Sequence, residues 1–402
     1  MIRDFPVEPP PPRRRGSGRH GRGGSAGKTA LLIGGAVMTL VLLAALVVWL
    51  APGEGPAGAN DSSSPDPDDS QSDDPNTVTL TGVGDTIMGV LPDELPPNNA
   101  ADYFDGVSEE LAGDVVFGNL EGPLSTRDEF RKCGEAPGEP EDPECFYIRM
   151  PPEYASVLAD AGFNVMSIAN NHAYDAGPDG HADTQQNLTD AGLVASGVKG
   201  EISEIEVKGF KVAVVSTAAY DFYTNALDLE AVSALVSAAA EQADLVVFSM
   251  HVGAEGDDAR HVPGETEEYH GEVRGDSAAV SHAAVDAGAD VVFGHGPHVI
   301  RGMEYYNGRL IAHSLGNFAG YGVLQTEGAL GRGAILQVTL NPEGEWVSGR
   351  VVATRMVDDG FPASHPEIDP DGGAYDDVNE LSAADFGDAA ASVDDDGALN
   401  GP

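Results

Sequence analysis

Short apolar runs recur along the chain between residues 77 and 355, and segments of helical character separate several of them. The runs are 78–84, 114–119, 163–169, 210–217, 243–250, 289–294, 309–315 and 333–340. The helical candidates are 151–162, 180–192, 229–243 and the long stretch 267–288. Continuous apolar strands that alternate with helices are typical of a sheet covered on both faces. The pattern therefore predicts an α/β domain over residues 77–355.

Two turns late in this region predict antiparallel pairing beside the parallel strands. Asn307-Gly308 separates two strand-like runs, and a second polar turn spans residues 341–345. Asn-Gly favours the tight turn of a β-hairpin because both residues adopt a positive φ readily. We therefore expect mixed sheets flanked by helices.

Residues 160–172 and 286–298 share one layout. Each segment contains a helix end capped by glycine, then a buried strand, then a polar loop with histidine. Ligands of open α/β sheets bind at the carboxyl ends of the strands. The shared layout predicts a functional site formed by polar residues that follow the strands.

Residues 30–50 form an uncharged apolar run that follows a basic segment. At a helical rise of about 1.5 Å per residue, this run spans about 30 Å, the thickness of the hydrocarbon core of a bilayer. We interpret it as a transmembrane anchor, with residues 1–29 as a disordered cytoplasmic tail and everything after Leu50 exported. The alternative is a cleavable signal peptide, cut near residues 57–59, but its apolar region is usually only about 7–15 residues long.

Acidic residues dominate the chain beyond its N-terminus, and the formal net charge is −45. Residues 51–76 combine Gly, Pro, Ser and Asp with few apolar positions, which predicts a disordered acidic linker. Residues 356–402 lack Lys and Arg and show little periodicity, so we expect a disordered acidic tail there. A surface of this charge repels nucleic acid and excludes it as a partner.

The chain has two cysteines, Cys133 and Cys145, both in the region that we expect to be exported. An oxidising compartment favours their pairing. We predict a structural disulfide that closes a small loop rich in Pro and Glu.

Polar side chains with metal-binding chemistry follow five of the predicted strands. They are Asp85, Asn119 with Glu121, Asn170 with Asn171 and His172, His251, and His295 with His298. Taken singly, each is more often a turn, a helix cap or a hydrogen-bonded core residue. Together at strand ends, these carboxylate, amide and imidazole groups indicate a site for Zn, Mn or Fe rather than Ca.

Six motifs, taken in their order along the chain, resemble those of a known family. They are GDTIMG (84–89), NLEGPLS (119–125), SIANNHAYDAG (167–177), HVGAE (251–255), GHGPHV (294–299) and HSLGNF (313–318). They are similar to the motifs of the capsule-synthesis CapA proteins, which take part in poly-γ-glutamate export and anchoring and are distant relatives of calcineurin-like metallophosphoesterases. The resemblance covers the domain 77–355 and implies a metallophosphoesterase-like layered sandwich.

The resemblance also implies roles for individual side chains around one or two divalent transition-metal ions (Mn, Zn or Fe). The implied ligands are Asp85, Glu121 (with Asn119 as second choice), Asn171, His251, His295 and His298, the last as a ligand or a phosphate contact. His172 corresponds to the general acid, and we expect Asp175 to orient its imidazole. We interpret Asn170 as a turn residue without such a role.

The chain departs from the phosphoesterase pattern in the first of these motifs and from the pattern of the capsule-synthesis family in the last. Ile87 stands where a ligand histidine is expected, which removes one ligand of a two-metal site. His313 replaces a frequent tyrosine, either as a hydrogen-bonding strand residue or as a replacement ligand. In the same motif, we expect Gly316 to permit a tight turn and Phe318 to pack in the core.

Three functions are compatible with these residues. The first is a CapA-like protein of capsule or poly-γ-glutamate biosynthesis or export, held in the cell membrane by one helix, with an extracellular metal-dependent hydrolase site of the phosphoesterase type. Its substrate would be a phosphoester or an anionic polymer, and membrane subunits of a polymer synthase would be its partners. The second is a non-catalytic accessory protein that binds or tethers an anionic cell-surface polymer, which the isoleucine at position 87 favours. The third is a sensor or wall-associated binding module.

Overall fold

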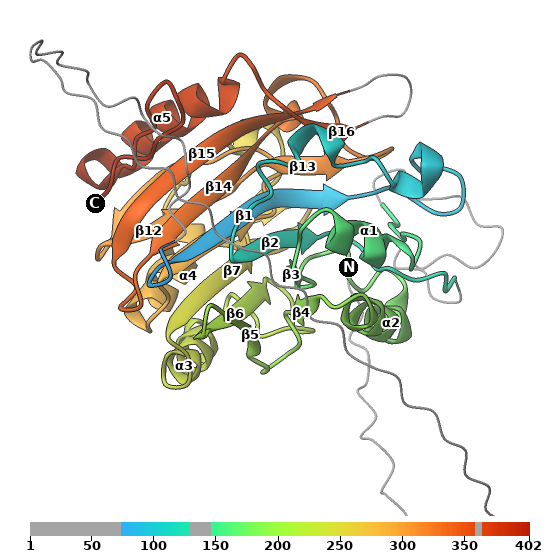
Figure 1. Cartoon of the computed structure of the whole chain (residues 1–402), viewed down its shortest axis with the longest axis horizontal. Helices are drawn as coiled ribbons and strands as arrows, with labels where there is room; N and C mark the ends of the chain where they lie inside the picture. Colours follow the sequence, from blue (N-terminus) through green and yellow to red (C-terminus); the bar gives the residue numbers. More distant parts are fainter. Residues whose placement is uncertain (1–73, 129–145, 358–363) are drawn as a thin grey trace, which may run out of the picture. The chain divides into compact units, whose positions relative to one another are not determined.

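Two mixed β-sheets lie face to face in the computed structural model, which describes residues 74–128, 146–357 and 364–402 (Figure 1). All of their strands belong to one compact unit, Ser70–Pro402. The first sheet has the order β16 (His365–Ile368), β15 (Trp346–Val357), β14 (Arg332–Leu340), β1 (Val78–Ile87), β2 (Val115–Leu120), β3 (Val165–Ser167) and β4 (Val194–Ser196), and β13 (Asn317–Gly320) also pairs with β1. The second has the order β11 (Met303–Tyr306), β12 (Arg309–Ala312), β10 (Val291–His295), β7 (Leu245–His251), β6 (Phe210–Ala218) and β5 (Ser203–Val207).

Each sheet combines parallel and antiparallel strands. In the first sheet β1, β2, β3 and β4 are parallel, whereas β14, β15 and β16 pair antiparallel. In the second, β6, β7, β10 and β12 are parallel, with β5 and β11 antiparallel at the edges. All eight predicted strands are present, and so are the two predicted hairpins, β11–β12 and β14–β15. The mixed α/β prediction is confirmed.

The inner faces of the two sheets share one apolar core. Phe117 on β2 stacks with Phe293 on β10 at a ring-centroid distance of 5.7 Å. Gly82 on β1 permits this approach, because a Cβ atom at that position would lie 2.8 Å from the Phe293 ring. The continuous apolar runs follow from this arrangement, since every residue of β7 and β10 is buried.

Four of the five helices that the structure describes cover the outer faces of the two sheets, which completes the layered sandwich. The helices are α1 (Tyr154–Asp160), α2 (Gly177–Asp190), α3 (Leu229–Ala240), α4 (Ser277–Asp286) and α5 (Gly373–Phe386), and the short 3-10 turns are η1 (Pro97–Ala100), η2 (Asp105–Val107), η3 (Asp257–Ala259), η4 (Gly328–Gly331) and η5 (Gly387–Ala389). Residues of α1 and α2 share an apolar cluster with the first sheet, and residues of α3 and α4 share another with the second.

The expectation of a helix across 267–288 is wrong in its first half. Residues in that half form a two-stranded ribbon of β8 (Glu267–Tyr269) and β9 (Glu272–Gly275). The turn between them consists of His270 and Gly271, both with positive φ, which no helix accommodates. Helix α4 begins only after Asp276, whose side chain accepts a hydrogen bond from the Ala279 amide and caps the helix.

The expectation of a disordered tail over 356–402 is also wrong for the residues that the structure describes. Strand β15 continues to Val357, β16 pairs with it, and α5 packs beside β14 and β15 (Figure 1). Ala374, Val378 and Leu381 on α5 are buried, and the first two belong to the inner core. Their spacing of four and three residues is that of one helix face. This apolar face was not recognised in the sequence, because it needs only a few apolar residues and these lie within a mostly acidic segment.

Several predictions about the flanks concern residues outside the described part of the chain. They are the tail 1–29, the anchor 30–50, most of the linker 51–76, and the disulfide between Cys133 and Cys145. Within residues 74–128, 146–357 and 364–402, no helix has the length and apolar character needed to cross a membrane.

Replacing Leu381 by alanine tests whether the C-terminal segment is part of the folded core. Leu381 is 1% exposed, so the substitution leaves a cavity and should lower the free energy of unfolding by about 2–5 kcal/mol. Chemical denaturation measures this change. Asp388→Ala, at an exposed position just beyond the same helix, is the control and should change stability by less than about 0.5 kcal/mol. Equal stability of the two variants would mean that the segment does not contribute to the core.

Candidate metal centre

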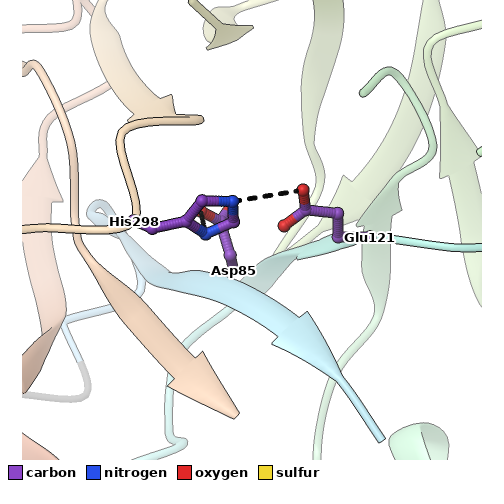
Figure 2. A group of neighbouring side chains, drawn as sticks. All are labelled: Asp85, Glu121 and His298. Atoms are coloured by element: carbon purple, nitrogen blue, oxygen red, sulfur yellow. Dashed lines mark ion pairs between the residues drawn. The ribbon is translucent and has the colours of Figure 1, made fainter. Parts of the chain in front are cut away.

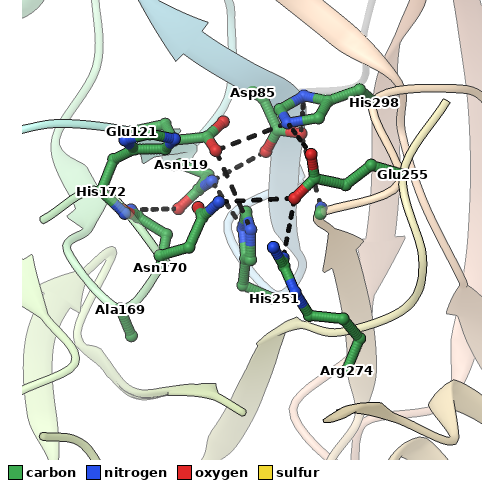
Figure 3. Close-up of polar contacts among 12 residues, drawn as sticks. Asp85, Asn119, Glu121, Ala169, Asn170, His172, His251, Glu255, Arg274 and His298 are labelled. Atoms are coloured by element: carbon green, nitrogen blue, oxygen red, sulfur yellow. Dashed lines mark hydrogen bonds and ion pairs between the residues drawn. The ribbon is translucent and has the colours of Figure 1, made fainter. Parts of the chain in front are cut away.

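The carboxyl ends of parallel strands from both sheets meet at one edge of the sandwich. Asp85 at the end of β1 lies in register with Asn119 on β2 and with Asn317 on β13. In the other sheet, His251 at the end of β7 lies in register with His295 at the end of β10. The strand order thus brings together polar residues that are far apart in the sequence (Figure 3).

Asp85, Glu121 and His298 form a buried cluster whose ligand atoms all lie within 4.8 Å of one another (Figure 2). His298 Nδ1 is 3.2 Å from Asp85 Oδ2, and His298 Nε2 is 3.5 Å from Glu121 Oε1. Two carboxylates and one imidazole are a donor set that suits divalent transition metals. Three of the six predicted ligands therefore converge.

The ionisable groups of this cluster shift one another's pKa values. Burial alone would raise the pKa of Asp85, but the hydrogen bond and charge of His298 outweigh it and hold the pKa below its usual range. Burial would lower the pKa of His298, yet Glu121 and Asp85 raise it well above its ordinary value. The charge of the His298 ring thus compensates the two carboxylates, and the backbone of His298 adopts the left-handed conformation (φ 61°) that places its ring between them.

His251 adjoins the cluster, and the surroundings of its ring suit a metal ligand. Its Nε2 atom is buried, lies 3.9 Å from Glu121 Oε1, and has no hydrogen-bond partner among the residues that the structure describes. Burial lowers the pKa of this imidazole well below its ordinary value, so the ring is neutral. A buried nitrogen without a partner is costly unless another group binds it. This atom fits a ligand position.

His295 does not join the cluster. Its Nε2 atom is 2.9 Å from the backbone oxygen of Val83, and its Nδ1 atom faces Ser249 Oγ at 3.5 Å. Both ring nitrogens have partners inside the chain because the ring packs between the two sheets, where it also contacts the Phe117 ring. The structure therefore gives no support to His295 as a ligand.

A chain of amides connects Asp85 to the turn after β3. Asn119 Nδ2 donates to Asp85 Oδ1 at 2.7 Å, and Asn170 Nδ2 donates to Asn119 Oδ1 at 3.1 Å. Asn170 Oδ1 in turn accepts from the His172 backbone amide at 3.1 Å. The interpretation of Asn170 as a plain turn residue missed this link. Its position directly before Asn171 and His172 was the available signal.

His172 and Asp175 make the contact that the sequence predicted. His172 Nδ1 is 2.7 Å from Asp175 Oδ2, which also accepts a hydrogen bond from the Ile148 amide at 2.8 Å. A carboxylate on Nδ1 fixes the orientation and the tautomer of the ring. The contact is confirmed, whereas the role of His172 as an acid stays a prediction.

Glu255 and Arg274 belong to the site, although the sequence motifs assigned them no role. Glu255 Oε2 is 3.9 Å from His298 Nε2, and Glu255 Oε1 is 2.7 Å from Arg274 Nη1 (Figure 3). Asn171 Nδ2 donates to Glu255 Oε1 at 3.4 Å. Asn171 thus contacts Glu255, which lies beside the cluster, and the role of Asn171 as a ligand stays a prediction. The signal for Glu255 was its place in the motif that begins with His251.

The segment after β12 supports the site. The Gly316 carbonyl accepts a hydrogen bond from the Asp85 amide at 3.0 Å. Gly316 has a φ of 71°, which fits the predicted tight turn, and Phe318 is fully buried, as predicted. Asn317 Oδ1, which the sequence motifs did not single out, lies 2.8 Å from His298 Nδ1. His313 bonds to Glu304 Oε1 at 3.1 Å and to Ser277 Oγ at 3.2 Å, so it is a hydrogen-bonding residue and not a replacement ligand.

Comparison with known proteins agrees with the motifs. The chain is 32% identical over 262 residues to the PGA biosynthesis protein CapA of Bacillus subtilis (strain 168), covering 60% of this chain and 63% of that protein. It is 29% identical over 265 residues to the capsule biosynthesis protein CapA of Bacillus anthracis, covering 60% and 59%. The match therefore spans about six tenths of the length of these relatives. A 5'-nucleotidase precursor from Thermus thermophilus aligns with a TM-score of 0.37 and 15% identity, covering 75% of this chain and 57% of that one.

A family model gives the wider assignment. Residues 79–321 match the model described as bacterial capsule synthesis protein PGA_cap. This range contains all six motifs, and it carries every residue of the cluster described above. The resemblance to the CapA proteins is confirmed, and the chain belongs to the bacterial capsule synthesis protein family PGA_cap.

Proposed function

We propose that this chain is a metal-dependent hydrolase of the phosphoesterase type that acts on a phosphoester or an anionic polymer in capsule synthesis. The observation that carries the proposal is the buried cluster of Asp85, Glu121 and His298 in a site that also holds the His172–Asp175 pair. The partner class follows from the relatives, one of which is a PGA biosynthesis protein. We also propose that residues 30–50 anchor the chain and that the described domain is extracellular.

The residues that would hold the ion are Asp85, Glu121 and His298, with His251 at the adjoining position. Such an ion supplies water activation and neutralises the charge of an anionic substrate. That neutralisation matters here because a chain with a net charge of −45 repels polyanions. Glu255 and Arg274 form the rim of the site, where Arg274 offsets the charge of Glu255.

His172 is the residue that we propose as proton donor. Its Nδ1 hydrogen is held by Asp175, so the imidazolium form of the ring would donate its Nε2 proton to a leaving oxygen and keep the hydrogen on Nδ1. Asn170 holds the backbone of His172 and, through Asn119, connects it with Asp85. Asp175 acts through His172 and is therefore a positioning residue.

The second candidate is an accessory protein that binds an anionic polymer without cleaving it. Ile87 favours this function, because its buried side chain occupies the place where the resemblance implies a further ligand. The two candidates share the metal cluster and differ in whether His172 transfers a proton.

Metal content tests the cluster. The full-length chain, grown with adequate Mn and Zn, should contain at least one transition-metal ion per molecule by elemental analysis. Asp85→Asn and Glu121→Gln should each weaken Mn²⁺ affinity by at least about 10–100-fold, because each removes a charged donor. Glu304→Gln is the matched control, since Glu304 is a buried carboxylate bound to His282 and His313 outside the cluster. A metal-free parent protein would contradict the assignment.

Hydrolysis of an aryl phosphate in the presence of Mn²⁺ separates the two candidate functions. His172→Ala should lower kcat by about 10²–10⁴-fold while the Mn²⁺ affinity stays unchanged, because the variant loses only the proton donor. His270→Ala, at a histidine on the exposed β8–β9 turn, is the control and should keep the parental rate. Equal rates in the parent and in His172→Ala would rule out the catalytic role and leave the accessory function.

A further inference from the structure

Glu255 lies on the loop between β7 and β8 and faces the cluster. Several hydrogen bonds fix the first half of this loop. The Gly253 amide donates to the Arg274 carbonyl, and the Gly256 amide donates to the Pro297 carbonyl, both at 3.0 Å. Arg301, a fully buried arginine, donates from Nε to the Ala259 carbonyl at 2.7 Å and from Nη2 to the Ala254 carbonyl at 3.3 Å. These bonds make residues 253–259 one connected unit around Glu255.

Helix α5 holds the other half of the same loop through two carboxylates. Asp377 forms an ion pair with Arg260. Asp385 Oδ1 lies 2.8 Å from His261 Nδ1, and Asp385 Oδ2 accepts a hydrogen bond from the Val262 amide at 2.9 Å. Three consecutive loop residues are thus bound to one helix. They directly follow the unit that Arg301 contacts.

Other contacts fix α5 independently of the loop. Asp377 also pairs with Arg332 on β14, at 2.8 Å from Nε to Oδ2. Ser382 Oγ accepts a hydrogen bond from the Met303 amide at 2.8 Å, and the neighbouring Leu381 is buried. Helix α5 therefore has contacts with the folded core besides those with the loop.

We propose that Asp377 and Asp385 form a C-terminal latch that positions Glu255 at the cluster. The latch lies outside residues 79–321, the range that matches the family model. Asp377 and Asp385 are positioning residues, because they act on Glu255 only through the loop. The part of this inference that concerns metal affinity rests on the proposed function, and the part that concerns loop order does not.

Amide hydrogen exchange in the full-length chain tests the latch directly. Asp385→Ala should speed exchange about tenfold at Val262 and also at Gly253 and Gly256, because the whole loop loosens. Asp385→Asn keeps an oxygen that accepts from the Val262 amide and should restore exchange close to the parental rate. Asp388→Ala removes one exposed charge from the same end of the helix and should change nothing. Faster exchange at Val262 alone would overturn the proposal.

Mn²⁺ affinity, measured by calorimetry, supplies the second readout. Asp385→Ala should weaken affinity about tenfold, with Asp385→Asn and Asp388→Ala close to the parent. Unchanged affinity together with a loosened loop would overturn the positioning of Glu255. Should the parent bind no Mn²⁺, the proposed function fails and the exchange data alone decide the latch. If Asp385→Ala does not fold, His261→Ala replaces it, since that side chain is 62% exposed and its removal leaves no cavity.

Discussion

The burial of carboxylates at the end of β1 is the constraint on which this site depends. Asp85 and Glu121 are fully buried, and a buried charge is tolerated only when other charges and hydrogen bonds compensate it. Asn119 and the ring of His298 meet this requirement for Asp85. The left-handed backbone at His298 and the glycine turn at Gly316 are the local distortions that bring these partners into place.

The sheet topology explains why the groups that compensate the buried carboxylates come from so many parts of the chain. Parallel strands place their carboxyl ends at one edge, and the face-to-face packing of two such sheets doubles the number of ends that meet there. Gly82 has a part in this arrangement, because only a residue without a side chain lets Phe293 approach β1 closely. Core packing and site geometry are therefore set by the same few strands.

Much of the fold could be predicted because its signals are local. A strand that is buried on both faces, such as β7, is a continuous apolar run, and the polar residue that ends it is visible in the sequence. Edge strand β5 could not be recognised in this way, because its residues alternate between half-buried and exposed and include two glutamates. The same holds for helix α5, whose apolar face is narrow and lies within an acidic segment.

The site was harder to predict where side-chain direction depends on packing. His295 and His298 have the same chemistry and lie three residues apart, yet only His298 enters the cluster, because the ring of His295 bonds to the backbone of β1. The contacts of Glu255 with Arg274 and His298 join separate segments of the chain, so no sequence spacing reveals them. The Asp175–His172 contact was predictable because the two side chains lie only three residues apart.

Strand β14 has a consequence for how the chain can be divided. It begins at Arg332, after the family match has ended at Tyr321, and it pairs antiparallel with β1 from Val78 to Val83. A fragment cut to the matched residues would leave the unpaired edge of a long, apolar central strand open to water and to other chains. Exposed edges of this kind promote strand-to-strand aggregation. The shortest soluble piece of this protein must therefore extend well past the boundary that sequence similarity suggests.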